Sequence, residues 1–226
     1  FVRPTNRWAG HIARVADSVT LQGHPGALER AYLAARPADL PPYPTGRAEA
    51  VSPVDAVATA DFAKAVWGTE RAIGRGATDV GWDSSITVLY ATAGIGHERR
   101  MWAVVRGSHI VGLALRTVLS TPLNFSLLDR RAEIVVAAGL SDRERVVTDL
   151  AHAVIADARA HGEPIVPLMI EATDAPAAMA AGFADDGMSY VEHLWPVTAA
   201  AEGVAAFRQL YTGRTRRHGM QAGAVA

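Results

Sequence analysis

The chain has 226 residues, of which half are hydrophobic and 20% are charged, and it contains no cysteine. This length and apolar fraction suit one large globular domain, or a domain with an extension, and exclude a disordered chain. Lys and Arg number 22 against 23 Asp and Glu, which gives a net charge of −1. Such a balance carries no electrostatic signature of nucleic-acid or anionic-membrane binding. The lack of cysteine excludes disulfides, thiolate metal sites and cysteine nucleophiles.

The first segment of the chain is set apart by prolines. Residues 24–36 predict a short helix with Leu28, Tyr32 and Leu33 on one face. Residues 37–46 then contain four prolines, which fit neither a helix nor a central strand. We expect a linker or extended surface loop here, so that residues 1–46 form an N-terminal extension that packs on the main body or on a partner chain.

A different pattern begins at residue 47. Residues 47–51 predict a short strand. Ser52 and Pro53 are typical of a helix start, and the helix is expected to run to about residue 72, before a group of glycines. The apolar run 86–91 predicts a strand or a buried segment.

The centre of the chain predicts a hairpin followed by a strand and a long helix. Strands at 101–106 and 109–120 are joined by Gly107 and Ser108, and a third strand covers 131–138. An apolar stripe at helical spacing predicts a helix from Asp142 to about His161, with Gly162 ending it.

The last third alternates strands with a short helix. Residues 164–172 predict a buried strand in which Pro167 suggests a bulge or an edge. Asp174 is expected to cap a short alanine-rich helix that ends before Gly182, and 187–197 predicts the final strand. Residues 198–226 are expected to form a weak helix and a disordered tail. This order predicts a mixed α/β fold.

Three stretches of residues 47–197 together resemble the GCN5-related N-acetyltransferase (GNAT) superfamily. The hairpin MWAVVRGSHIVGLAL is similar to the second and third strands of that family. AEIVVAA with its polar loop and long helix resembles the fourth strand and the diphosphate-binding loop. DAPAAMAAGF resembles the end of the fourth helix. The resemblance implies a central, mostly antiparallel sheet flanked by helices, and a fourth strand that splays from the fifth.

The resemblance also implies an activity and a set of site residues. An acyl-CoA, with acetyl-CoA the first choice, would transfer its acyl group directly to an amine of a small molecule or protein. Glu133 matches a glutamate that serves as the base in part of the family. Its ordinary alternative is a solvated carboxylate at a strand end, paired with Arg130 or Arg131. The cofactor-binding residues implied are Val135, Val136, Ala137, Arg143, Arg145, Val146 and Asp174.

Some family features are absent, which keeps a second function open. The paired glycines of the diphosphate loop are missing. Arg143 and Arg145 would supply charge instead, although the ordinary explanation of the two arginines is a solvated first helical turn. Ala178 stands where the family often has a tyrosine acid. The alternative to an enzyme is a catalytically degenerate module for binding or assembly.

No further cofactor follows from the sequence. His152 and His161 lie nine apart and fall on opposite faces of one helix, and no HExxH pattern occurs, so we expect no metal. No apolar run is long enough to span a membrane. We expect a cytoplasmic protein that binds neither nucleic acid nor membrane, with a homodimer plausible.

Overall fold

The computed structural model describes residues 20–21, 24–25, 27–44, 46–51, 56–74, 77, 85–120 and 131–193. The chain divides into two compact units, Phe1–Leu28 with Val191–Ala226, and Glu29–Tyr190. In the first unit, β1 (Thr20–Leu21) pairs with β2 (His24–Pro25) in an antiparallel ribbon. The start of the helix expected at Ser52 and the C-terminal segment 198–226 lie outside the described residues. The domain boundaries expected at 46 and 197 stay predictions.

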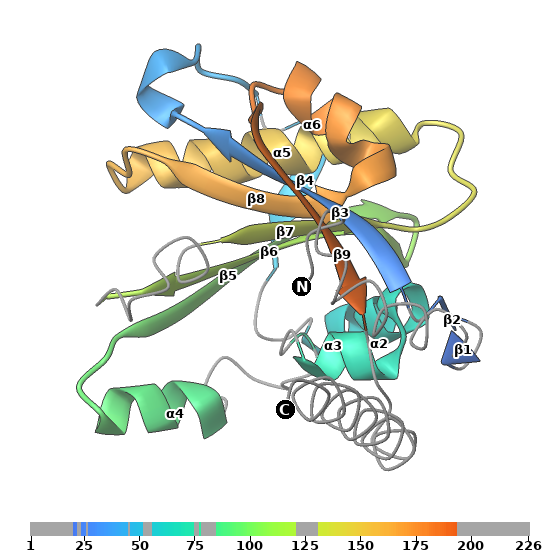
Figure 1. Cartoon of the computed structure of the whole chain (residues 1–226), viewed down its shortest axis with the longest axis horizontal. Helices are drawn as coiled ribbons and strands as arrows, with labels where there is room; N and C mark the ends of the chain where they lie inside the picture. The colour runs from blue at the N-terminus through green and yellow to red at the C-terminus, as the bar shows by residue number, and fades with distance from the viewer. Residues whose placement is uncertain are drawn as a thin grey trace, which may run out of the picture. The chain divides into compact units, whose positions relative to one another are not determined.

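A seven-stranded sheet forms the centre of the fold (Figure 1). In spatial order its strands are β4 (Ala48–Ala50), β5 (His97–Arg106), β6 (His109–Leu119), β7 (Ala132–Val136), β8 (Val166–Glu171), β3 (Ala27–Ala35) and β9 (Ala184–His193). The neighbours β4–β5, β5–β6, β6–β7 and β3–β8 are antiparallel, and β7–β8 is parallel. The expected mixed α/β fold with a mostly antiparallel sheet is confirmed.

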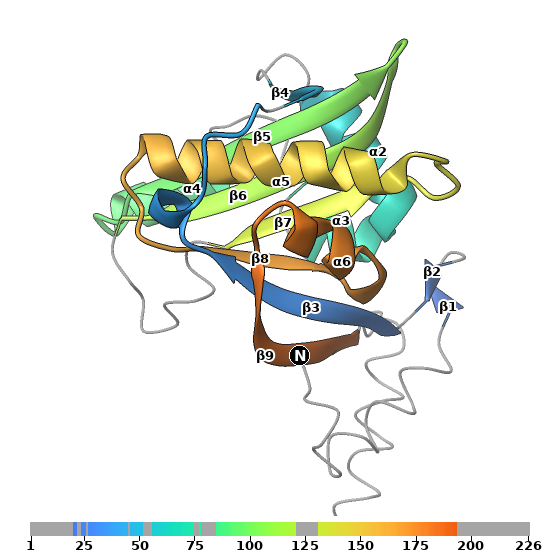
Figure 2. The same ribbon diagram turned by 90° about the horizontal axis from the view of Figure 1, so that it is seen from above.

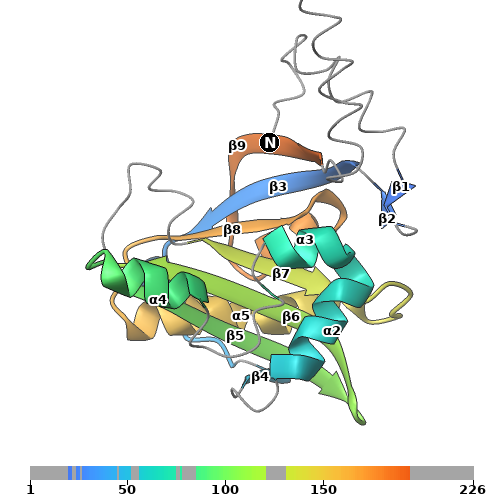
Figure 3. The ribbon, with the colours of Figure 1, turned by 90° about the horizontal axis from the view of Figure 1, so that it is seen from below.

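Helices cover both faces of this sheet. Figure 2 shows α5 (Arg143–Ala160) lying along one face with α6 (Ala175–Ala180) beside it. Figure 3 shows α2 (Ala56–Trp67) and α3 (Thr69–Gly74) against the opposite face. Each face has its own buried cluster, and the residues of β7 alternate between them, with Ile134 on the α5 side and Val135 on the α2 side.

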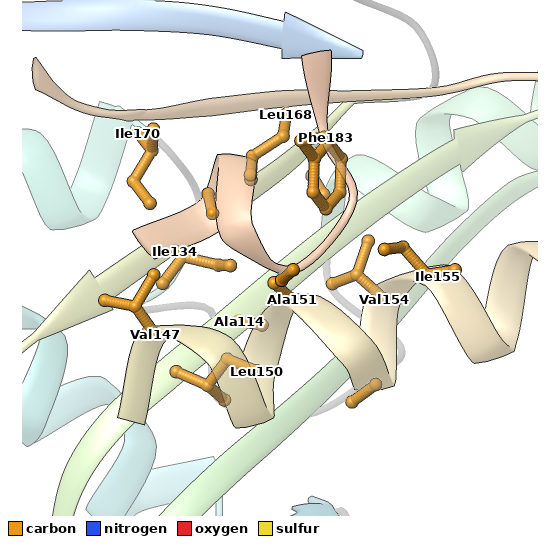
Figure 4. Close-up of a cluster of buried hydrophobic side chains, with 14 of the residues drawn as sticks. Ala114, Ile134, Val147, Leu150, Ala151, Val154, Ile155, Leu168, Ile170 and Phe183 are labelled. Atoms are coloured by element: carbon orange, nitrogen blue, oxygen red, sulfur yellow. The ribbon is translucent and has the colours of Figure 1, made fainter. Parts of the chain in front are cut away.

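The larger cluster lies under α5. The apolar stripe of this helix packs on side chains from β6, β7 and β8, together with Phe183, which follows α6 (Figure 4). The helix lies close to the sheet at Gly112 of β6, where an added Cβ would lie 2.4 Å from Cγ1 of Val146. The missing side chain of Gly112 is therefore what lets the helix approach the sheet.

Several predicted elements are confirmed. The strand at 47–51 is β4, the hairpin 101–120 is β5 and β6, and the strand at 131–138 is β7. The long helix begins and ends within one residue of the predicted limits, with Asp142 and His161 as its capping residues. Gly162, just beyond it, has a φ of 65°, the left-handed conformation that favours glycine.

The helix predicted for residues 24–36 is wrong, because this segment forms strand β3. Six of its residues pair antiparallel with β8, from Arg30 opposite Glu171 to Ala35 opposite Val166. Leu33 and Ala35 belong to the α5 cluster, and the intervening positions face the other side. Since Tyr32 and Arg30 are buried as well, the strand has no polar face to reveal its period of two.

Two other predictions are corrected. Residues 86–91, read as a strand or buried segment, lie in helix α4 (Ser85–Thr92), where Val88 is exposed. The single helix expected up to residue 72 is divided into α2 and α3 at Gly68, whose φ is 85°. Pro167 marks neither an edge nor a bulge. It lies near the start of β8, an internal strand, just before the pairing with β7 begins at Leu168.

The proline-rich segment crosses α5 as an ordered strap. Its first residues form a short 3-10 helix, η1 (Pro37–Asp39). The guanidinium of Arg159 donates hydrogen bonds to the backbone carbonyls of Pro37, Leu40 and Pro41. Further along, the ring of Tyr43 stacks on His152 with the centroids 4.2 Å apart. Residues 37–44 therefore link β3 to the helix side of the sheet.

Candidate functional site

Strands β7 and β8 separate after two paired positions. Their parallel register covers Ala132 with Leu168 and Glu133 with Met169, and no further pair follows although both strands continue. The separation expected between the fourth and fifth strands of residues 47–197 is thus present. The carboxyl ends of adjacent parallel strands diverge here, which is a common location for ligand sites in α/β folds.

Glu133 lies at the last paired position before this gap. Its side chain is 3% exposed, on the face covered by α2 and α3, where it neighbours Leu115 of β6. One carboxylate oxygen accepts a hydrogen bond from Arg30 at 3.2 Å, and the other accepts one from Nε of Arg131 at 2.9 Å. The ordinary alternative for Glu133 was a solvated carboxylate at a strand end, paired with Arg130 or Arg131. The pairing with Arg131 is present, but the carboxylate is buried rather than solvated.

Arg30 belongs to β3 and is fully buried. The same nitrogen that reaches Glu133 also lies 3.2 Å from the carbonyl oxygen of Met169, which is 139 residues away in sequence. This guanidinium therefore ties β3, β7 and β8 together at the point where β7 and β8 begin to diverge. A buried ion pair held by additional hydrogen bonds fixes the geometry of its strands, because breaking it would leave an uncompensated charge.

The backbone beyond Glu133 presents acceptors to the gap. The N–H of Ala137 donates to the carbonyl of Val111 on the β6 side. Because the peptide group is planar and its C=O and N–H point in opposite directions, the carbonyl of Val136 faces the β8 side. Val135, whose side chain is buried under α2, precedes it in the strand.

Arg143, the first residue of α5, fills this position. Its Nη1 donates to the carbonyls of Val136 at 3.0 Å and Ala137 at 2.9 Å. Its Nε and Nη2 donate to the two carboxylate oxygens of Asp174 at 2.6 and 2.7 Å, and Nη2 lies 3.5 Å from Glu171. The hydrogen bonds to Asp174 are the main cause that raises the pKa of Arg143.

Asp174 is buried and precedes α6, as expected, but it makes no side-chain capping hydrogen bond. Its carboxylate is directed to Arg143 instead. Five of the predicted cofactor-binding residues, Val135, Val136, Ala137, Arg143 and Asp174, are therefore brought to one end of β7 and β8.

The other two predicted residues lie on the first turn of α5. Arg145 is exposed, whereas Val146 is fully buried against β6, and its N–H donates to the carbonyl of Asp142. The carboxylate of Asp142 pairs with Arg106 and, at 3.1 Å, with Arg47, and these bonds lower its pKa. Asp142 does not cap the helix with its side chain, and its backbone carbonyl accepts from the N–H groups of Arg145 and Val146.

Sequence reasoning missed Arg30 and the link between Arg143 and Asp174. Arg30 was placed in a helix that the structure shows as a strand, so its proximity to Glu133 was hidden. Arg143 and Asp174 were both singled out, but separately. The sequence did contain a signal for this link. Arg143 stands at the start of a helix and Asp174 follows the next strand, and these two positions lie at the same end of a helix packed on a sheet.

Within the described ranges, no group of three or more His, Asp or Glu side chains is arranged to hold a metal ion. Nor does any described helix combine the length and the apolarity that crossing a membrane requires.

Comparison with known proteins gives similarity to solved structures alone. No family model matches the sequence, and no curated protein matches it. A GNAT-family acetyltransferase from Novosphingobium aromaticivorans is similar over 76% of this chain and 67% of its own, at 15% identity and a TM-score of 0.43. A GCN5-related N-acetyltransferase from Sphaerobacter thermophilus aligns with 84% of this chain and 56% of its own, at 18% identity and a TM-score of 0.46.

A tandem GNAT protein from the clavulanic acid biosynthesis pathway is similar over 75% of this chain, at 12% identity and a TM-score of 0.42. The aligned part covers 54% of that protein and 61% of an acetyltransferase from Colwellia psychrerythraea, so this chain corresponds to little more than half of several neighbours.

Proposed function

We propose that this protein is an acyl-CoA-dependent N-acyltransferase of the GCN5-related type, transferring an acyl group, with acetyl the first choice, to an amine. The observation that carries the proposal is the gap between parallel β7 and β8, with Glu133 at its closed end. A carboxylate, backbone acceptors and a helix N-terminus converge on this gap. The similarity of the sequence to the GNAT pattern over residues 47–197 supports the same assignment.

The residues at the gap fit an acyl-CoA in part. The carbonyl of Val136, which faces the β8 side, provides a strand-like acceptor for an amide-containing arm such as pantetheine, and the carbonyl of Ala137 lies just beyond the end of the strand. The start of α5, a helix N-terminus with exposed Arg145, suits a diphosphate. Against this, Asp174 and Glu171 lie beside Arg143 and add negative charge.

In this proposal Glu133 prepares the acceptor. An amine attacks a thioester only when it is neutral, so a base must take its proton, directly or through a water. The nitrogen then bonds to the acyl carbon, the carbon–sulfur bond breaks, and the thiolate leaves. Arg30 and Arg131 each donate a hydrogen bond to one oxygen of the Glu133 carboxylate, which fixes its position at the closed end of the gap.

The leaving thiolate receives no proton from Ala178 of α6, the position at which the GNAT family often has a tyrosine acid. Ala178 is fully buried in the α5 cluster, and its methyl group has no proton to give. We therefore infer that the thiolate leaves without a side-chain acid from this helix, and that the rate depends chiefly on the base and on positioning.

Calorimetric titration with acetyl-CoA tests binding first. We expect measurable heat and a thermal shift, and no heat at millimolar acetyl-CoA contradicts the enzyme assignment. Thiol release in the presence of a panel of primary amines then tests catalysis. Glu133→Gln is expected to reduce turnover by roughly 10²-fold or more, the range for a general base, with unchanged acetyl-CoA affinity.

Glu98→Gln is the matched control for that substitution, since Glu98 is also paired with an arginine but is exposed on β5. It is expected to leave turnover unchanged. An equal turnover in Glu133→Gln and the wild type would remove Glu133 from the mechanism.

The second candidate is a binding or assembly module that has lost catalysis. The observation favouring it is that Arg143 occupies the backbone acceptors in the gap. In that case acetyl-CoA does not bind, and a small-molecule or protein partner is held elsewhere on the fold. Cytoplasmic location and homodimerisation belong to both proposals.

A further inference from the structure

One side chain of this protein bridges the gap between β7 and β8. Arg143 donates to the carbonyls of Val136 and Ala137 on the β7 side. On the other side it forms a two-point contact with Asp174, which follows β8, and approaches Glu171, the last residue of β8. The planar guanidinium has five N–H groups, and these contacts engage all three of its nitrogens.

The two halves of this bridge differ in strength. Asp174 is 4% exposed, and its contact with Arg143 is a bidentate ion pair with N–O distances of 2.6 and 2.7 Å. The contacts to the carbonyls of Val136 and Ala137 are longer, at 3.0 and 2.9 Å, and their acceptors carry no formal charge. Charge-assisted bidentate pairs are the stronger class of hydrogen bond. Under competition the carbonyl half is therefore the one that would open.

We propose that Arg143 is an intramolecular latch, which must release the carbonyls of Val136 and Ala137 before an acyl-CoA arm can pair with β7. This inference rests on the proposed function, because it concerns the same backbone acceptors. A carbonyl oxygen can accept two hydrogen bonds, but the bulky guanidinium occupies the space beside β7 in which the arm would lie, so the latch competes directly with the ligand and weakens its apparent affinity.

Release requires no movement of the backbone. Arg143 is the first residue of α5 and its side chain is 26% exposed, so rotation about its side-chain bonds suffices to withdraw the guanidinium from β7. Asp174 and Glu171 retain the charge of Arg143 near the β8 end during this motion. The ion pair with Asp174 thus keeps the guanidinium near the carbonyls of Val136 and Ala137, so that it can bind them again.

The test removes the latch without leaving a buried charge. The double variant Arg143→Ala with Asp174→Asn eliminates both partners of the ion pair and leaves the net charge unchanged. Its matched control is Arg36→Ala with Asp39→Asn, two substitutions at exposed positions that together also preserve net charge. Acetyl-CoA is titrated into each chain by calorimetry, and pantetheine, which has no phosphate, is titrated as a second probe.

We expect the double variant to bind acetyl-CoA about tenfold more tightly than the wild type. This magnitude corresponds to the loss of competing hydrogen bonds from a charged donor. Pantetheine is expected to tighten as well, since the carbonyls are freed for the arm itself. The control pair is expected to match the wild type.

Three results would overturn the latch. Equal affinity for acetyl-CoA in the double variant and the wild type shows that Arg143 does not compete, and weaker affinity shows that it contributes to binding; in both cases the proposed function stands. Absence of binding to both chains removes the proposed function and the latch together. If the double variant does not fold, as judged by circular dichroism, Arg143→Lys serves instead.

Lysine preserves the charge opposite Asp174, but its single ammonium group cannot span the carboxylate and both carbonyls as a planar guanidinium does. An intermediate tightening of acetyl-CoA binding is expected for Arg143→Lys. An affinity equal to or weaker than that of the wild type contradicts the proposal by itself.

Discussion

His152 is a single residue that couples the proline-rich strap to solvent pH. Burial is the main cause that lowers its pKa below 6.5, and it is partly opposed by a hydrogen bond to the backbone of Pro44 and by the charge of Asp149. A histidine with a depressed pKa binds protons more readily when the chain is unfolded. The contribution of neutral His152 to the free energy of unfolding is therefore complete above about pH 6.5, the ordinary pKa of histidine. It is lost as the pH falls through the range below that value.

We predict that His152→Gln reduces the acid sensitivity of the fold. The difference in melting temperature between pH 7.5 and pH 5.5 is expected to be smaller in this variant than in the wild type. His109→Gln, at an exposed position beside the β5–β6 turn, is the control and should retain the full difference. Identical differences in both variants would show that the environment of His152 has no influence on stability.

At the scale of residues, sequence reasoning identified side chains better than their partners. Glu133, Arg143 and Asp174 were singled out, and the structure brings them to the same end of β7 and β8. What the sequence did not reveal was that Arg30 and Arg131 hold the carboxylate, or that Arg143 turns onto Asp174. Such pairings join residues far apart along the chain and depend on strand order, which local patterns do not encode.

At the scale of elements, the contact between α5 and β6 depends on Gly112. A Cβ at this position would lie 2.4 Å from Cγ1 of Val146 and 3.0 Å from Cδ1 of Leu150. Both side chains are fully buried, so neither can move aside into solvent. Overpacking of this kind typically costs about 1–3 kcal/mol, because a close-packed interior accommodates little extra volume.

We therefore predict that Gly112→Ala lowers the free energy of unfolding by about 1–3 kcal/mol, as measured by urea denaturation. Adding Val146→Ala to this variant removes the closest clashing group and should recover part of the loss. The single substitution Val146→Ala is needed to complete the cycle. Strictly additive effects of the two substitutions would contradict a direct clash.

Two kinds of signal made elements predictable from the sequence. The stripe of α5 shows the helical period because a polar face lies opposite an apolar one. The β5–β6 hairpin, whose second strand is buried on both faces, was predicted from its apolar runs and the turn at Gly107 and Ser108. In β3 the buried residues Arg30, Tyr32, Leu33 and Ala35 lie on both faces, so the pattern was read as helical. In α4 the branched and aromatic residues favoured a strand, and context overrode that preference.

At the scale of the whole molecule, β3 is an internal strand of the main sheet. It lies between β8 and β9 in the strand order, supplies Leu33 and Ala35 to the α5 cluster, and provides Arg30 to Glu133. Removing it would expose the edge of β8 and half of an ion pair. The body of the fold is thus completed by residues from the segment that was expected to be an extension.

We predict that a chain lacking residues 1–36 loses the cooperative thermal unfolding transition seen in the full chain by circular dichroism. A synthetic peptide of residues 24–36, added in excess, should restore part of the transition by re-forming the strand. Glu29→Gln in the full chain, an exposed change within β3, is the control and should unfold normally. A cooperative transition in the truncated chain without peptide would support the domain boundary expected at residue 46.

The position of β3 also sets a constraint on the order in which the chain folds. Arg30 and the carbonyl of Met169, which it contacts, are separated by 139 residues, so their strands cannot meet until most of the protein has left the ribosome. Contacts of such high sequence separation slow folding, because the entropy of closing the loop is lost before the contacts are gained. During synthesis β3 therefore stays unpaired until β8 has been made. A chaperone that shields residues 27–35 in that interval would act on the step that completes the sheet.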